Sequence, residues 1–282
     1  MAEAVPDTAT AANTSELDRR RGFAQRATAL ERPASVPELV LHLAGEITPI
    51  WQMTEVELAT EGLPPPFWAF AWAGGQAVAR YVLDHPERVA GRRVLDLAAG
   101  SGICGIAACL AGAAGVVAAD IDPFCDASIA LNAAANGVEV AFTAADLLGA
   151  QPPAAEVVLA GDVCYEQQMS RQMLGWLRQA HEAGALVLLG DPGRAYLDTW
   201  GLTLLAEYDI VTTPELEDAA SKRTRSTRWP EPWRARSRRR TLGRRPEPRA
   251  GSAPPPCEGV PHSDLGPAVT DHRSGVGLAT CV

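Results

Sequence analysis

Residues 94–105 read VLDLAAGSGICG, an apolar run that passes through a glycine turn into a segment of helical length. The pattern predicts a β-strand, a tight turn at Gly100-Ser101-Gly102 and the start of a helix. Such a turn needs glycine because a backbone without Cβ lets a nucleotide approach the helix N-terminus, where unpaired N–H groups bind anions. Gly100 to Gly105 also fit GxGxxG, a weak fingerprint shared by binders of NAD, FAD and S-adenosylmethionine.

On either side of this turn, short apolar runs alternate with segments of helical length. Apolar strands buried on both faces are typical of parallel sheets, and their alternation with helices predicts βαβ units. We therefore expect an α/β fold with a doubly wound, Rossmann-like and mostly parallel sheet. The expected strands lie at residues 94–97, 116–120, 138–142, 156–162, 185–191 and 207–213, and the expected helices at 103–111, 124–136 and 166–182.

Two aspartates near the turn bear on the choice of cofactor. Asp120 ends the next expected strand, where a carboxylate accepts hydrogen bonds from ribose hydroxyls, and this position suits NAD and S-adenosylmethionine alike. Asp96 discriminates better, because a carboxylate beside the turn repels a pyrophosphate but suits the cationic amino group of a methionine. The pattern favours S-adenosylmethionine. As alternatives, Asp96 is a turn former and Asp120 belongs to a helix start.

Polar residues also follow the later expected strands, at the edge where open α/β sheets bind ligands. Asp146 could accept a hydrogen bond from an adenine amino group, or could cap a helix instead. Asp162 and Tyr165 are spaced so that both side chains face one pocket if a helical turn begins there. Asp162 would orient an incoming ammonium and Tyr165 would shape its channel, with the proton leaving to water or a nearby base. The alternatives are a helix cap for Asp162 and a packing role for Tyr165.

The flanks of this core have other compositions. Residues 1–14 are small and polar and are predicted to be disordered, and a helix is expected from Ser15 to Arg32, where Pro33 follows. Residues 15–66 form an N-terminal extension that ends in a proline-rich connection, and residues 67–220 form the nucleotide-binding domain. Residues 221–282 form a low-complexity tail rich in Arg and Pro that should not fold alone.

Charge and composition exclude several classes of protein. Of the 282 residues 47% are hydrophobic, yet no run of about 18 apolar residues would span a membrane, and no secretory signal begins the chain, so we expect a cytoplasmic protein. Six cysteines without CxxC spacing predict free thiols and no metal site. The net charge of −9 divides into −17 for residues 1–220 (12 Arg, 29 Asp and Glu) and +8 for the tail. A basic arm for nucleic acid is the weaker reading of that tail.

Taken together, these motifs resemble the class I, seven-stranded S-adenosylmethionine-dependent methyltransferases. The closer similarity is to the protein-lysine methyltransferases with a DxxY motif, here Asp162-Val-Cys-Tyr165. Within that branch the chain resembles the enzymes that methylate the β-subunit of electron transfer flavoprotein, over roughly residues 35–224. The motifs that carry this resemblance are VLDLAAGSG, VVAADIDP, AADLL, LAGDVCYE, PPFWAFAWAGGQAVARY (65–81), DIDPF (120–124), the LN..AN run (131–136) and LLGDPGR (188–194).

The resemblance implies S-adenosylmethionine as cofactor and the electron transfer flavoprotein β-subunit as protein substrate. It implies that Trp72 and the Gly100-Ser101-Gly102 loop contact the cofactor, that Asp120 holds the ribose and that Asp146 lies near the adenine. Gly161 would line the site, and Asp162 and Tyr165 would hold the target lysine. The alternative acceptors are a small amine such as nicotinamide or a ribosomal protein. The alternative class is an inactive nucleotide-binding or RNA-binding protein.

Two features depart from the family pattern. Ala98 stands where the glycine loop often has glycine, and its small side chain should be tolerated. Members of the family usually end soon after the segment that reads TTPELEDAASKRT in this chain, which continues for nearly sixty residues. We hypothesise that the reading frame is lost between Ser221 and Arg225, because a shifted frame in a GC-rich gene yields Arg, Pro, Ala, Gly and Ser. The last strand of the sheet would then be missing.

Overall fold

The computed structural model describes residues 8–45, 50, 65–212 and 217–230, with side chains from residue 16 onward. These residues belong to one compact unit, Met1–Arg234, and a second unit, Ala235–Val282, lies outside them. The predictions made for residues 1–7 and 231–282 therefore fall outside the described residues.

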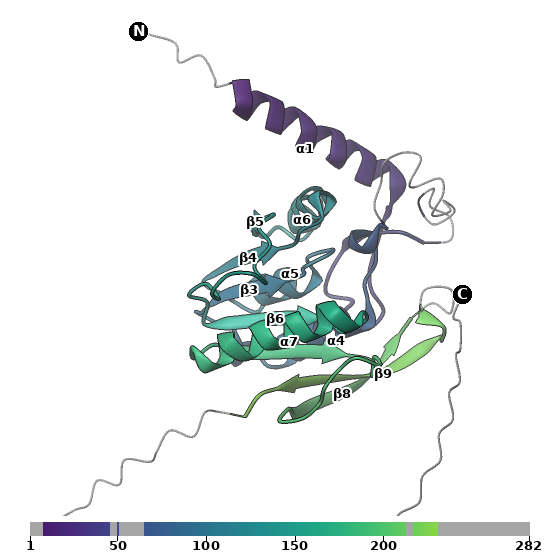
Figure 1. Ribbon diagram of the computed structural model, residues 1–282. Helices are drawn as coiled ribbons and strands as arrows, with labels where there is room; N and C mark the ends of the chain where they lie inside the picture. The colour runs from purple at the N-terminus through teal and green to yellow at the C-terminus, as the bar shows by residue number, and fades with distance from the viewer. Residues whose placement is uncertain (1–7, 46–49, 51–64, 213–216, 231–282) are drawn as a thin grey trace, which may run out of the picture. The chain divides into compact units, whose positions relative to one another are not determined.

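A seven-stranded sheet forms the centre of the first unit, in the order β5-β4-β3-β6-β7-β9-β8 (Figure 1). The strands from β5 to β7 are parallel, whereas β9 and β8 add antiparallel at one edge. The prediction of a mostly parallel α/β sheet is confirmed. The strands are β3 (Arg93–Leu97), β4 (Gly115–Ala119), β5 (Ala141–Thr143), β6 (Val157–Gly161), β7 (Leu186–Asp191), β8 (Thr203–Val211) and β9 (Ser221–Arg228).

Helices cover both faces of the sheet, because alternate residues of each strand point to opposite sides. Val94 and Val157 pack with helices α4 and α5 on one face, and Leu95 and Val158 pack with α7 on the other. In Figure 1 the ribbon of α7 lies across the sheet. The sheet is doubly wound, as predicted. The helices are α4 (Ala73–Asp84), α5 (Ile103–Leu110), α6 (Pro123–Ala135) and α7 (Gln167–Glu182).

The first turn of α4 lies directly on the carboxyl end of β6. A Cβ added to Gly161, the last residue of β6, would lie 2.6 Å from both N and Cα of Gly75. A Cβ on Gly74 would lie 2.7 Å from the backbone N of Asp162. Backbone atoms cannot yield as flexible side chains do, so this approach requires glycine on both elements. The short 3-10 helix η1 (Phe67–Ala69) precedes α4, and a second one, η2 (Pro86–Arg88), follows it.

The N-terminal extension differs from its prediction. Helix α1 spans Thr8–Ala27, so it begins within the segment predicted to be disordered and ends before the predicted Arg32. The chain then forms a short hairpin of β1 (Ala29–Glu31) and β2 (Leu41–Leu43). Phe23 of α1 packs against Phe124 of α6, with ring centroids 5.6 Å apart, which explains why this helix forms beside the core.

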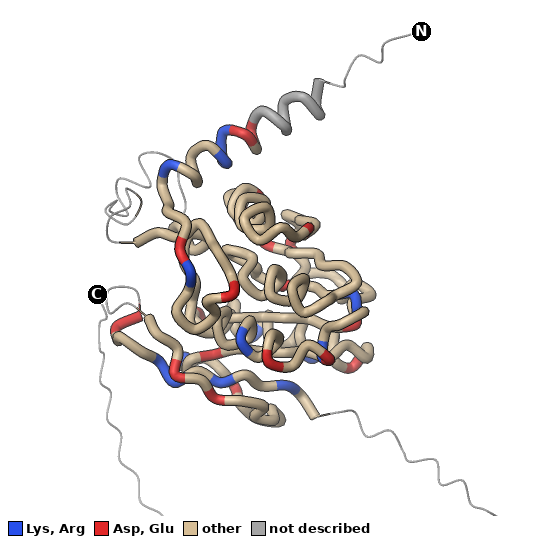
Figure 2. Tube along the Cα trace, turned by 180° about the vertical axis from the view of Figure 1, so that it is seen from behind, with Lys and Arg blue, Asp and Glu red and all other residues tan. Residues whose placement is uncertain are grey.

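The prediction that the last strand is missing is wrong, because residues 221–228 form β9 between β7 and β8. Its outward arginines face acids of β8 in register: Arg223 lies 3.6 Å from Asp209 and Arg225 lies 3.3 Å from Glu207. Basic and acidic positions lie side by side along these two strands in Figure 2. Trp229, just beyond the strand, is buried in the core under α7. The folded body therefore extends to about residue 230, and the four basic residues of β9 reduce its charge from −17 to −13.

Candidate active site

The glycine turn joins β3 to α5 through three residues with positive φ, namely Ala98 (53°), Gly100 (54°) and Gly102 (78°). A Cβ on Gly102 would lie 2.9 Å from Cγ1 of Ile129, so that position requires glycine. The nearest atom to a Cβ on Gly100 would be the carbonyl oxygen of Phe67, at 3.9 Å. The outer side of the turn is therefore open, and it leaves room for the close approach of a ligand to the backbone.

Asp120 follows β4 and binds the glycine turn. Its carboxylate accepts the N–H of Gly100 at 2.9 Å and that of Asp122 at 3.0 Å. Asp122, rather than Asp120, caps α6, so the helix-start alternative for Asp120 does not hold. The next residue, Ile121, is 72% exposed and was not predicted as a site residue. Its position directly after Asp120 in the sequence DIDP could have identified it. A nucleoside needs a hydrogen-bond acceptor for its ribose hydroxyls and an apolar surface for its base. The Asp120 carboxylate and the adjacent Ile121 side chain offer this combination.

Asp96 has a different place from the one predicted. Its side chain is only 1% exposed, and Oδ2 accepts the N–H of Gly105 in the first turn of α5 at 2.7 Å. Burial raises the pKa of this carboxyl to about 8, against the lowering effect of the hydrogen bond from Gly105. The structure thus gives Asp96 a role in holding the turn to α5. Its contact with a methionine amino group stays a prediction.

The remaining predicted cofactor residues surround the same turn or lie further along the edge. Ser101 is buried, and its carbonyl accepts Nδ2 of Asn132 at 2.8 Å. Trp72 is the N-cap residue of α4, and its Nε1 donates to the carbonyl of Phe67 at 3.0 Å. Asp146 is exposed and accepts a backbone N–H two residues ahead, at 3.0 Å, in a local turn. Their contacts with the cofactor, like the adenine contact of Asp146, stay predictions.

Asp162 follows Gly161 at the end of β6 with φ of 56° and is buried. Its Oδ2 accepts the N–H groups of Gly74 and Gly75 in the first turn of α4, the latter at 3.1 Å. Burial raises the pKa of the carboxyl to about 6, although the nearby Arg194 lowers it. No helical turn begins here; α7 starts at Gln167 with Glu166 as its cap, so Asp162 does not cap that helix.

Two further residues complete this cluster, and neither was predicted as a site residue. Arg194, in the loop after β7, donates Nε and Nη2 to Oδ1 of Asp162 at 3.1 and 2.7 Å. Its Nη2 also reaches Oε1 and Oε2 of Glu217 at 3.2 and 3.3 Å. The guanidinium lies over Trp72, with Cζ 5.9 Å from the ring centroid. Arg194 could have been predicted, because it ends the motif LLGDPGR that supports the family resemblance. Glu217 lies in no such motif.

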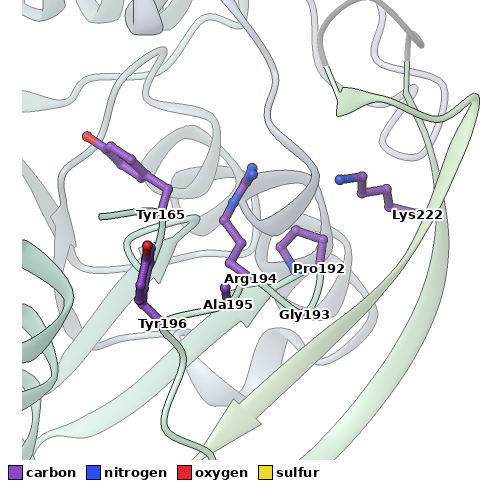
Figure 3. Close-up of a pocket in the computed structure, with 7 residues that line it drawn as sticks. All are labelled: Tyr165, Pro192, Gly193, Arg194, Ala195, Tyr196 and Lys222. Atoms are coloured by element: carbon purple, nitrogen blue, oxygen red, sulfur yellow. The ribbon is translucent and has the colours of Figure 1, made fainter. Parts of the chain in front are cut away.

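A cavity of about 200 Å³ opens beside this cluster. Of the predicted site residues only Tyr165 lines it, with Arg194, Tyr196 and Lys222 among its neighbours (Figure 3). The Lys222 side chain is directed toward Arg194, whereas the Tyr165 hydroxyl points away from it. Tyr165 is half-exposed, its ring centroid is 5.8 Å from that of Phe67, and burial raises the pKa of its hydroxyl. The cavity therefore has aromatic walls beside a buried carboxylate.

The described residues contain no cluster of three His, Cys, Asp or Glu side chains that could hold a metal ion, and the predicted free thiols are found at four described cysteines. None of the described helices is long and apolar enough to cross a membrane. The site has a glycine turn with the Asp120 carboxylate on one side and the Asp162 carboxylate beside an aromatic cavity on the other. This arrangement suits transfer between a nucleoside cofactor and an amine acceptor.

The chain is similar to several known proteins. The family model of ribosomal protein L11 methyltransferase matches residues 80–162, the stretch from α4 to Asp162. Among solved structures, ribosomal protein L11 methylase from Lactobacillus delbrueckii subsp. bulgaricus aligns over 57% of this chain and 81% of its own, with 20% identity and a TM-score of 0.41.

Several curated relatives carry the name electron transfer flavoprotein beta subunit lysine methyltransferase, among them proteins from Xenopus laevis and Danio rerio. The Xenopus laevis protein is 34% identical over 215 residues, which cover 74% of this chain and 85% of the relative. The Danio rerio protein is 41% identical over 137 residues, which cover 48% of this chain and 53% of the relative. The chain therefore belongs to the electron transfer flavoprotein β-subunit lysine methyltransferase family and is an S-adenosylmethionine-dependent methyltransferase.

Proposed function

We propose that this protein transfers methyl groups from S-adenosylmethionine to lysine side chains of the electron transfer flavoprotein β-subunit. The names of its relatives support this substrate. The single observation that carries the lysine acceptor is the buried carboxylate of Asp162, which lies next to the aromatic cavity at the end of β6. Aromatic walls accommodate the aliphatic stem of a lysine side chain, with its amino group directed to the polar end of the site at Asp162.

Residues after β3 and β4 are proposed to bind the cofactor, and residues after β6 are proposed to bind the lysine. The bound cofactor supplies an electrophilic methyl group. Asp120, which accepts the N–H of Gly100, would hold the ribose together with the glycine turn, and the exposed apolar side chain of Ile121 would cover the base. Asp162 and Tyr165 place the lysine, so that most of the rate enhancement comes from positioning.

The test is transfer of labelled methyl groups to purified electron transfer flavoprotein, with the modified residue identified by mass spectrometry. The informative variant is Asp162→Asn, because asparagine tolerates the positive φ at this position and keeps one hydrogen-bond acceptor. Glu156→Gln is the matched control, since it makes the same carboxylate-to-amide change at an exposed residue at the start of β6. We expect a loss of at least about 100-fold in kcat/KM for Asp162→Asn and none for the control. Equal activity of the two variants would refute the role of Asp162.

Two other acceptors belong in the same assay. The family-model match over residues 80–162 favours ribosomal protein L11 as the second candidate, although that match covers the segment proposed to bind the cofactor and ends before the residues that line the cavity. A small amine such as nicotinamide is the third. Labelling of L11 or nicotinamide without labelling of the flavoprotein would overturn the proposed substrate. Cofactor binding without methyl transfer to any of the three would favour a nucleotide-binding protein without this activity.

A further inference from the structure

The cluster of Asp162 and Glu217 is filled by this chain's own groups. At Asp162, Oδ1 takes two N–H groups of Arg194 and Oδ2 takes two N–H groups from the first turn of α4. At Glu217, Oε1 takes the N–H of Ala73 at 3.3 Å and Nη2 of Arg194, and Oε2 takes Arg194 and lies 3.4 Å from Nζ of Lys222. Each of the four carboxylate oxygens therefore already contacts two donors, which is a full complement for a carboxylate.

The two carboxylates and the two cations that these contacts join also balance one another in charge. Two buried carboxylates, Asp162 and Glu217, face the two cations Arg194 and Lys222. The other described groups that act on the cluster or line the cavity are acidic or neutral side chains, and one of them, the Asp191 carboxylate, adds negative charge near Asp162 and Arg194. Arg194 and Lys222 are therefore the cations of the site. These other groups are Cys104, Asp120, Cys164, Tyr165, Glu166, Asp191 and Tyr196.

An incoming lysine ammonium therefore meets a saturated carboxylate and a fixed guanidinium. Two like charges a few ångströms apart repel strongly in the partly buried environment of a protein site. A neutral amine avoids that repulsion, and a neutral amine is the form whose lone pair can accept a methyl group. Free lysine has a pKa near 10.4, so at neutral pH the site has to favour deprotonation of its acceptor.

We propose that Arg194 makes the acceptor site select lysine as the neutral amine, an inference that rests on the proposed function. The lysine ammonium releases one proton to water as it enters, and it keeps the electron pair of that N–H bond as the lone pair that accepts the methyl group. Arg194 acts electrostatically and transfers no proton, because a guanidinium stays protonated in proteins. Without Arg194, Asp162 would pair with the ammonium and the proton would stay on the acceptor nitrogen.

The contrary role for Arg194 is that of a removable plug, which the lysine displaces from Asp162. The contacts of Arg194 make its displacement from Asp162 unfavourable. The Arg194 side chain is held by two carboxylates and by the face of Trp72, and its backbone N–H donates to Oδ1 of Asp191 at 2.7 Å. A flexible lysine would have to replace all the side-chain contacts with fewer hydrogen bonds than a guanidinium makes.

The experiment is the pH profile of kcat, at saturating concentrations of the protein substrate that the wild type methylates, because kcat reports the groups that titrate in the enzyme–substrate complex. Arg194→Gln should move the alkaline rise of activity up by at least about one pH unit, with activity restored at high pH. Arg194→Lys keeps the charge and should keep the profile. Arg178→Gln, an exposed arginine of α7, is the matched control. Glu217→Gln removes one negative charge beside Arg194 and should move the rise down instead, which provides a second variant should Arg194→Gln not fold.

Several results would overturn this proposal. A loss of activity that is equal at every pH, in both Arg194 variants, would mean a purely structural role. Higher activity of Arg194→Gln at every pH would mean a plug. Melting curves and calorimetric binding of S-adenosylmethionine, measured on the same samples, identify an unfolded variant. A wild type that methylates no lysine would refute the proposed function itself, and that result is separate from an unshifted profile.

Discussion

Replacing Gly161 by alanine tests the close contact between α4 and β6 on which the acceptor site is built. The new Cβ would lie 2.6 Å from N and Cα of Gly75, whereas carbon atoms pack at roughly 3.5 to 4 Å. The first turn of α4 therefore has to move by about 1 Å. That movement breaks the hydrogen bonds from Gly74 and Gly75 to the Asp162 carboxylate, each worth about 1.5 to 3 kcal/mol because the acceptor is charged.

The expected loss of unfolding free energy is therefore about 3 to 6 kcal/mol, or a fall in melting temperature of roughly 6 to 24 °C for a domain of this size. The matched control is Gly175→Ala in α7, where an added Cβ meets nothing within 4 Å. It should raise stability by about 1 kcal/mol through helix propensity. The assay is thermal and urea unfolding of all three proteins. A Gly161→Ala variant as stable as the wild type would refute the reasoning.

Two further predictions concern pH and the end of the fold. Burial raises the pKa of Asp96 from 3.8 to about 8, so the folded state holds a proton that the unfolded state loses, and stability falls by about 1.4 kcal/mol per unit as pH rises through this range. Asp96→Asn should remove that part of the slope in urea unfolding between pH 5 and pH 8, and an unchanged slope would exclude Asp96 as its source. Ending the chain after Pro230 should leave melting temperature and methyl transfer intact, whereas ending it after Ala220 should abolish folding because β9 is lost. Equal stability of the two truncated chains would contradict the place of β9 in the sheet.

The parallel part of the fold could be predicted because its strands are apolar on both faces. The apolar runs around Leu95 and Leu188 predict buried strands from the sequence alone. Strand β9 could not be predicted in this way, since Thr224, Ser226 and Thr227 occupy its buried positions. Their hydroxyls are satisfied inside the protein, for example Ser226 by the carbonyl of Ala77 at 3.1 Å, so the strand needs no apolar period.

The site shows the same division. Gly100, Asp120 and Asp162 follow predicted strands. Because the carboxyl ends of parallel strands meet at one edge of the sheet, the sequence predicts that these three residues lie near one another. The pairing of Asp162 with Arg194 and Glu217 does not follow from it. Those residues lie 32 and 55 positions further along the chain, and the loop after β7 brings the first of them to the site.

The position of β9 has a consequence for the order in which the sheet is assembled. Strand β8 is made first but pairs only with β9, and β9 inserts between β7 and β8. Until residue 228 has been synthesised, the backbone N–H and C=O groups that β7 will pair with β9 are unpaired, and its apolar side chains lie at an open edge of the sheet. Such edges pair with strands of other chains. Of the strands that the structure describes, the last to be synthesised is thus the one that covers the edge of β7. Folding during synthesis should leave an aggregation-prone intermediate that chaperones protect until β9 arrives.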